Sequence, residues 1–135
     1  MKDLDQARNM LLIASKDYQA LTGMQDPAAF PTEVFGFHVQ QAVEKALKAW
    51  LCCLGVVFPK IHDLDELAAV LRDAGAVLPE QFVPLLEYAD FAVAFRYDVL
   101  PDLSADIDRS SVTHQVRRLL GHVETVLRDA EAREH

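Results

Sequence analysis

Apolar residues recur at steps of three and four along most of the chain, which is the period of an amphipathic helix. In a first segment, from about Asp3 to Thr22, these positions are Leu4, Ala7, Leu11, Leu12, Ala14, Tyr18 and Leu21. In a second segment, from about Thr32 to Leu54, they are Phe35, Val39, Ala42, Val43, Ala46, Ala49, Trp50 and Cys53. Both segments are predicted to be helices that bury one face.

Three later segments show the same period. The third segment begins at Asp63 and ends at Gly75, and the fourth begins at Pro79 and continues to Phe95. The fifth runs from about Asp108 to Ala132. β-branched residues never alternate over a useful length, so no strand is predicted. The predicted fold class is all-α, an antiparallel helical bundle. The long apolar stripe of the last segment fits either the inside of this bundle or a second copy of the chain.

Polar residues and glycines mark the expected helix ends. Asp3 followed by Gln6 resembles a capping box, and Thr32 is a plausible N-cap for the second helix. Gly23 and Gly55 are expected to end the first two helices, since glycine readily adopts the left-handed conformation found there.

The composition indicates one soluble domain. The chain has 135 residues, of which 51% are hydrophobic and 25% charged, enough for one core but not for two domains. No apolar run approaches the length of a membrane span, about 18 residues. The N-terminus carries acidic residues and lacks an apolar signal core. A single cytoplasmic domain over residues 1–135 is therefore expected.

The charge is strongly acidic and unevenly distributed. There are 21 acidic and 13 basic residues, for a formal net charge of −8. Proteins that coat DNA or anionic membranes are basic, so neither DNA nor a membrane is an expected partner. Residues 63–108 hold eleven acids against two arginines. Any phosphate contact is therefore expected on the less acidic second helix or beside Arg96.

No metal and no cofactor is expected. Cys52 and Cys53 are adjacent in an apolar run, where a disulfide between neighbours would be strained, so they are predicted to be reduced core thiols. Their spacing matches no zinc site. Asp98, Asp102 and Asp106 lie in one acidic loop, but their spacing matches no calcium-binding loop.

Four polar residues of the second helix fall on one face, again at steps of three and four: Gln41, Glu44, Lys45 and Lys48. We call them the polar strip. One interpretation is a surface that binds a nucleotide or a partner protein. The other is a solvated helix face with an intrahelical Glu44–Lys48 pair, worth only about 0.2–0.5 kcal/mol.

Three blocks of sequence suggest a family. FHVQQAVEKALKAWL is followed by a proline-broken loop, by IHDLDELAAVL and, twenty-odd residues later, by FAVAFRY. In this order they resemble the HEPN domain, named for nucleotide binding in prokaryotes and higher eukaryotes, over about Leu4 to Leu127. The resemblance implies an up-and-down bundle of four main helices plus a short helix. It also implies a homodimer, as in many members, encoded beside a minimal nucleotidyltransferase in a two-component module resembling a toxin–antitoxin system.

Some HEPN proteins are metal-independent ribonucleases with an arginine and a histidine four to six residues apart after the fourth helix. Arg96 matches that arginine by position, but residues 101–103 contain no histidine. Arg109 and His114 have the spacing at another place, at the start of the last helix, and are weak catalytic candidates. Because the motif is not found at its usual position, catalysis is not the leading expectation.

His62 and Arg96 extend the candidate site beyond the second helix. In a functional interpretation, His62 acts as acid or base and Arg96 holds a phosphate with two hydrogen bonds. In a structural one, His62 bonds across its loop and Arg96 pairs with a carboxylate such as Glu44. The predicted binding residues are Gln41, Glu44, Lys45, Lys48, His62, Asp63, Arg96 and Tyr97.

The leading hypothesis is a HEPN-type domain that binds a nucleotide or a nucleotidyltransferase partner through these residues. The first alternative is a metal-independent ribonuclease toxin acting on RNA. The second is a purely structural dimerisation module whose polar strip is ordinary surface.

Overall fold

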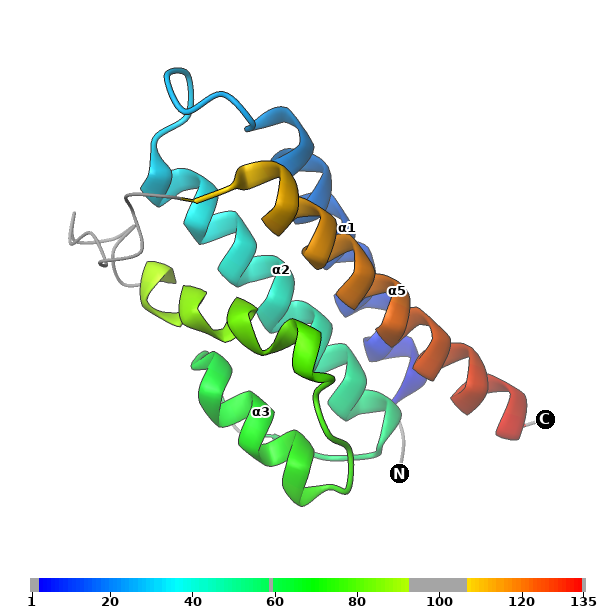
Figure 1. Ribbon diagram of the computed structural model, residues 1–135. Helices are drawn as coiled ribbons and strands as arrows, with labels where there is room; N and C mark the ends of the chain where they lie inside the picture. Colours follow the sequence, from blue (N-terminus) through cyan, green and yellow to red (C-terminus); the bar gives the residue numbers. More distant parts are fainter. Residues whose placement is uncertain (1–2, 59, 93–106, 135) are drawn as a thin grey trace.

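The structure, a computed structural model, describes residues 3–58, 60–92 and 107–134. Within these ranges the chain is all-α, with no strand. The elements are α1 (Leu4–Gly23), α2 (Thr32–Cys53), α3 (Leu64–Asp73), the 3₁₀ helix η1 (Glu80–Asp90) and α5 (Arg109–Arg133). The long elements α1, α2, η1 and α5 alternate in direction, and α3 is the short extra helix (Figure 1). The predicted fold class is confirmed.

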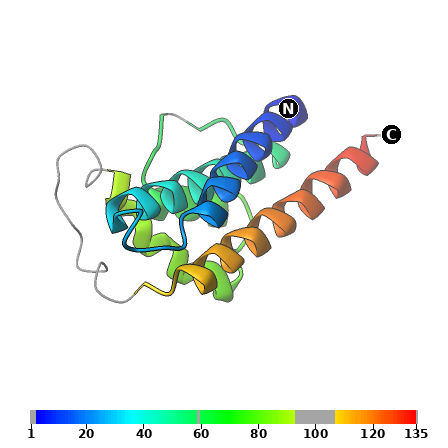
Figure 2. The ribbon, with the colours of Figure 1, turned by 90° about the horizontal axis from the view of Figure 1, so that it is seen from above.

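Helix α2 is the centre of the molecule and contacts each of the other four elements. Figure 1 shows α1 and α5 on one side of α2, and α3 and η1 on the other. From above, α1, α2 and α5 lie alongside one another (Figure 2). Because neighbours cover α2 on several sides, most of its residues are buried, including polar ones. Its position explains why its apolar stripe is broad.

The apolar stripe of α5 is used within the chain. Its buried residues include Val116, Leu119, Leu120, Val123 and Leu127, and α5 contacts α1, α2 and η1. The most extensive contact between described elements is that of α1 with α2, and both helices carry fully buried alanines: Ala7 and Ala14 in α1, and Ala42, Ala46 and Ala49 in α2. Small side chains allow two helices to approach closely, so these helices form a tight pair.

Aspartates cap three helices. The carboxylate of Asp3 accepts a hydrogen bond from the Gln6 amide at 3.0 Å. Asp63 and Asp108 cap α3 and α5 in the same way, through backbone amides two and three residues further on. The prediction of Thr32 as N-cap is wrong, because Thr32 is the first helical residue and Pro31 precedes it without a side-chain cap.

Glycines end α2 and α3 in the left-handed conformation, with φ of 75° at Gly55 and 92° at Gly75. Gly23 is instead the last residue of α1 and has no positive φ, so its predicted role is wrong. Gly36 is needed for another reason. A Cβ there would overlap the ring of the fully buried Phe91, so a side chain at 36 would displace η1's C-terminal end from α2.

The fourth predicted helix is a 3₁₀ helix, preceded by Pro79 and with Pro84 inside it. Proline has no N–H to donate, which weakens α-helical hydrogen bonding here. Phe82, Leu85, Tyr88 and Phe91 are all buried. Because a 3₁₀ helix has three residues per turn, this three-residue spacing places them on one side. The predicted continuation to Phe95 lies outside the described residues.

Among the described helices, none is long and apolar enough to cross a membrane.

Candidate functional site

The polar strip of α2 is largely buried. Glu44 is 2% exposed and Lys48 7% exposed, while Gln41 and Lys45 are half-buried. The chain that follows α2 covers this face, since both Phe58 and His62 contact strip residues. The interpretation of the strip as a solvated helix face is therefore wrong, although its Glu44–Lys48 pair is present.

Glu44 is the centre of the site. Its Oε2 atom accepts hydrogen bonds from Lys48 Nζ at 3.0 Å and from Lys45 Nζ at 3.3 Å. The Nδ1 atom of His62 lies 3.2 Å from the same oxygen. An ionised carboxylate has no proton to give, so Nδ1 is the donor in this contact. Helix α2 and the segment that precedes α3 thus meet at one oxygen atom.

Gln40 completes the arrangement and is fully buried. Its Nε2 donates to Glu44 Oε1 at 2.8 Å and to the His62 carbonyl at 3.4 Å. Its Oε1 accepts from Gln41 Nε2 at 2.6 Å. The sequence prediction omitted Gln40, although it lies four residues before Glu44, and therefore on the same helix face. We call Gln40, Gln41, Glu44, Lys45, Lys48 and His62 the Glu44 cluster.

The electrostatics of the cluster keep Glu44 ionised. Burial by itself would raise the pKa of Glu44, but hydrogen bonds from Lys48, Gln40 and His62, and the charge of Lys45, outweigh burial and lower the pKa. Two ammonium groups thus face one carboxylate. The cluster carries a surplus positive charge in an otherwise acidic protein.

His62 is the exposed member of the cluster, with 68% of its side chain accessible. Its Nδ1 is held by Glu44 and its carbonyl by Gln40, so the ring has a defined position and Nε2 is the outward nitrogen. The next residue, Asp63, accepts from the Asp65 amide at 2.8 Å. Asp63 therefore acts as the cap of α3, which fixes the backbone on the other side of His62.

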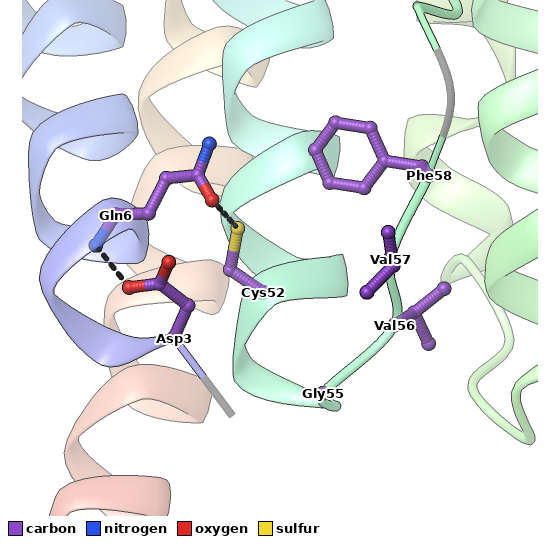
Figure 3. Close-up of a pocket in the computed structure, with 7 residues that line it drawn as sticks. All are labelled: Asp3, Gln6, Cys52, Gly55, Val56, Val57 and Phe58. Carbon is purple, nitrogen blue, oxygen red and sulfur yellow. Dashed lines mark hydrogen bonds between the residues drawn. The ribbon is translucent and has the colours of Figure 1, made fainter. Parts of the chain in front are cut away.

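Phe58 joins the cluster to a neighbouring pocket. Its ring centroid lies 5.9 Å from Lys48 Nζ, a cation–π contact. The pocket, of about 220 Å³, is lined by Asp3, Gln6, Cys52, Gly55, Val56, Val57 and Phe58. In Figure 3, Asp3, which caps α1, and Gln6 in its first turn face the segment with Val57 and Phe58, and Cys52 lies near the end of α2 between them.

Neither cysteine forms a disulfide, and both are buried. Cys52 Sγ donates to Gln6 Oε1 at 3.6 Å. Burial, together with the negative charge of Asp3, raises the pKa of the Cys52 thiol. Since the thiolate is the nucleophilic form, Cys52 is an unreactive core residue.

The other candidates are separated from the Glu44 cluster or lie outside the described residues, as Arg96 and Tyr97 do. Arg109 is buried, donates from Nη1 to the Met24 carbonyl at 2.9 Å and stacks 5.0 Å from the Phe35 ring centroid. His114 is exposed, about 140° further round α5. The structure therefore does not bring Arg109 and His114 together.

The described residues contain no group of three or more histidine, cysteine or acidic side chains that could hold a metal ion.

Comparison with known proteins gives one match. The family model of the HEPN domain matches residues 2–131, nearly the whole chain. Neither the curated proteins nor the solved structures include a significant match.

Proposed function

Because the chain belongs to the HEPN domain family, we propose that it is a binding domain whose Glu44 cluster takes a nucleotide or a minimal nucleotidyltransferase partner. In this proposal it works with that partner in a two-component, toxin–antitoxin-like module. The observation that carries the proposal is the convergence of Lys45, Lys48 and His62 on one buried carboxylate. The residues come from two of the three sequence blocks that resemble the family.

Stability alone is a weak reason for such a cluster. Taking charges out of water costs free energy, and well-packed apolar residues often stabilise a protein as much as a buried ion pair does. Groups whose pKa is shifted by neighbouring charges are also concentrated at functional sites. A buried carboxylate that orients an exposed histidine and a half-buried lysine is therefore better explained by binding than by folding.

The test combines titration calorimetry with ATP and affinity capture of the product of the adjacent gene. The variant is a Lys45→Ala, His62→Ala double substitution, because both side chains reach solvent and their loss should preserve the fold. Lys16→Ala, an exposed lysine of α1, is the control. We expect the double variant to lose both ligand and partner, and the control to keep them. Equal binding by all three proteins would contradict the proposed surface.

One observation favours metal-independent RNA cleavage as a second candidate function. Glu44 fixes Nδ1 of His62 and leaves Nε2 outward, which suits proton transfer to or from a substrate. The ammonium of Lys45, 3.3 Å from the same carboxylate, brings a positive charge to the site, and such a charge can stabilise the charge that develops on a phosphate. This candidate predicts RNA cleavage in the presence of a chelator, lost in His62→Ala and kept in His114→Ala. Absence of cleavage by the native protein would refute it.

The homodimer remains a proposal drawn from the family. The apolar stripe of α5 is buried within one chain and is therefore not the surface that would pair. Light scattering at several protein concentrations tests the oligomeric state. A purely structural dimerisation module would form the dimer yet bind neither nucleotide nor partner, and it would tolerate every substitution in the cluster.

A further inference from the structure

We infer that the Glu44 cluster recognises a terminal phosphate group, through Lys45 and His62, and that the base of a nucleotide contributes little to binding. The inference rests on the proposed nucleotide-binding function and narrows it to a chemical class, the phosphate monoester or the end of a polyphosphate chain. It follows from which polar atoms of the cluster are already used and which face outward.

Among the residues that the structure describes, two accept hydrogen bonds from Lys45, which lies at the open edge of the cluster. Its ammonium group gives one hydrogen bond to Gln41 Oε1 at 3.2 Å and one to Glu44 Oε2 at 3.3 Å. An ammonium has three N–H groups, so one is left, and the side chain is 20% exposed. Lys48 differs, because it is nearly buried between Glu44 and the Phe58 ring. Lys48 therefore holds the carboxylate, and Lys45 meets the ligand.

His62 supplies the second contact and the preference for a terminal group. With Nδ1–H donated to Glu44, the neutral ring presents Nε2 as an acceptor. A terminal phosphate loses its second proton near pH 6 and so still carries an ionisable proton close to neutrality, whereas a phosphodiester does not. That proton can be shared between the phosphate oxygen and Nε2. The pairing therefore favours a monoester or polyphosphate end over the internal linkages of RNA.

Most of the groups that could read a base are occupied within the cluster. The amides of Gln40 and Gln41 hydrogen-bond to each other, to Glu44 and to Lys45, which leaves one N–H of Gln41 Nε2. Among the described residues, the aromatic ring of Phe58 lies against the cluster, and it packs on the ammonium of Lys48. Reading a base needs free hydrogen-bonding edges or an open aromatic face. The phosphate, rather than the base, should thus determine affinity.

The experiment is titration calorimetry of the full chain with ATP, GTP, inorganic pyrophosphate, adenosine and the phosphodiester adenylyl-adenosine. We expect ATP and GTP to bind within about threefold of each other and pyrophosphate to displace both, because phosphate contacts dominate. Adenosine and the phosphodiester should bind at least about tenfold more weakly, as expected for the loss of one charge-assisted hydrogen bond. Lys45→Gln and His62→Ala should each weaken pyrophosphate binding about tenfold.

Lys16→Gln and His114→Ala remove the same residue types from exposed positions elsewhere and should leave binding unchanged. Circular dichroism melting curves confirm that each variant is folded. Nucleotide binding that differs more than about tenfold between ATP and GTP, or that pyrophosphate does not displace, would overturn this inference and leave the proposed function standing. Phosphodiester binding as tight as pyrophosphate binding would do the same. Failure of every phosphate compound to bind overturns the inference, and failure to capture the partner as well overturns the proposed function.

Discussion

Substitution of Glu44 by glutamine should destabilise the protein far more than the same substitution in an exposed ion pair. Glutamine has the shape of glutamate but no charge, so the packing of α2 stays the same. What changes is the residue that pairs with Lys48. The side chain of Lys48 is 9% exposed, and its ammonium forms an ion pair with Glu44. In Glu44→Gln this ammonium is left buried without a counter-charge.

The magnitude follows from which contacts are shielded from water. Breaking a buried pair from one side costs about 3–5 kcal/mol, and the amide oxygen of glutamine still accepts one hydrogen bond. Lys45 and His62 reach solvent, so their lost contacts are largely replaced by water. We therefore expect a loss of about 3 kcal/mol in the free energy of unfolding. Lys48→Met in the same protein should recover about 2 kcal/mol, since it removes the unpaired charge.

The same carboxylate makes stability depend on pH in acid. The pKa of Glu44 in the folded state lies below its ordinary value of 4.5, so the unfolded chain binds the proton first as the pH falls. The contribution of Glu44 is therefore complete at neutral pH and is lost as the pH falls below 4.5, through the folded-state pKa. Glu44→Gln should have lost this part of the acid dependence.

The assay is urea unfolding followed by circular dichroism, at pH 7 and in acid. The control is Glu124→Gln, because Glu124 and Arg128 form an exposed i, i+4 pair on α5 with a 3.7 Å separation. That substitution should change the free energy of unfolding by no more than about 0.5 kcal/mol. If Glu44→Gln costs no more than Glu124→Gln, the account of a carboxylate that neutralises buried Lys48 is refuted.

Three further predictions concern the bundle. Gly36→Ala should destabilise it by about 1–3 kcal/mol in thermal unfolding, because the new methyl group overlaps the buried Phe91 ring. Gly121→Ala is a matched change at an open position inside α5, and it should raise the free energy of unfolding by about 0.5–1 kcal/mol. An equal loss of stability in both variants would contradict the overlap with Phe91. Asp63→Ala should lower the free energy of unfolding by about 1 kcal/mol, because it removes the cap of α3. An unfolding curve that coincides with that of the native protein would contradict this role of Asp63. Burial raises the pKa of Tyr88 to about 12. Ultraviolet titration should therefore show one tyrosine that ionises near this pH, and Tyr88→Phe should remove that step. The free energy of unfolding should fall as the pH rises from 10 towards 12, because the unfolded chain loses the proton first.

Local rules of sequence account for the helices and most of their ends. The three- and four-residue steps place Ala7, Leu11 and Ala14 on the buried face of α1, as observed, but the prediction for Leu12 is wrong, because Leu12 is 58% exposed. Asp3 and Asp63 cap helices because their side chains reach amides only a few residues away. The same reasoning gave the wrong result at Thr32, where two adjacent candidates, proline and threonine, compete for one boundary. Such features depend on residues close together in the sequence, so they can be predicted without knowledge of the fold.

The fourth helix shows where period alone is insufficient. Residues 82, 85, 88 and 91 are apolar at steps of three, and Leu86 and Ala89 also fit steps of four. Both helix types were therefore compatible with the pattern. The buried face follows steps of three, with Pro84 inside the helix. Helix η1 packs against α2, α3 and α5, and these contacts cannot be read from the period of the sequence.

The sequence by itself determined that Gln41, Glu44, Lys45 and Lys48 share one face of a helix, because helical geometry depends only on spacing. Only the tertiary structure decided that this face is covered, that Gln40 belongs to it, and that His62 contacts Glu44 from eighteen residues away. Burial and contacts between distant residues arise from the packing of separate elements. The same four residues would form a solvated surface or an oriented ionic cluster, depending on whether the chain that follows α2 packs over them.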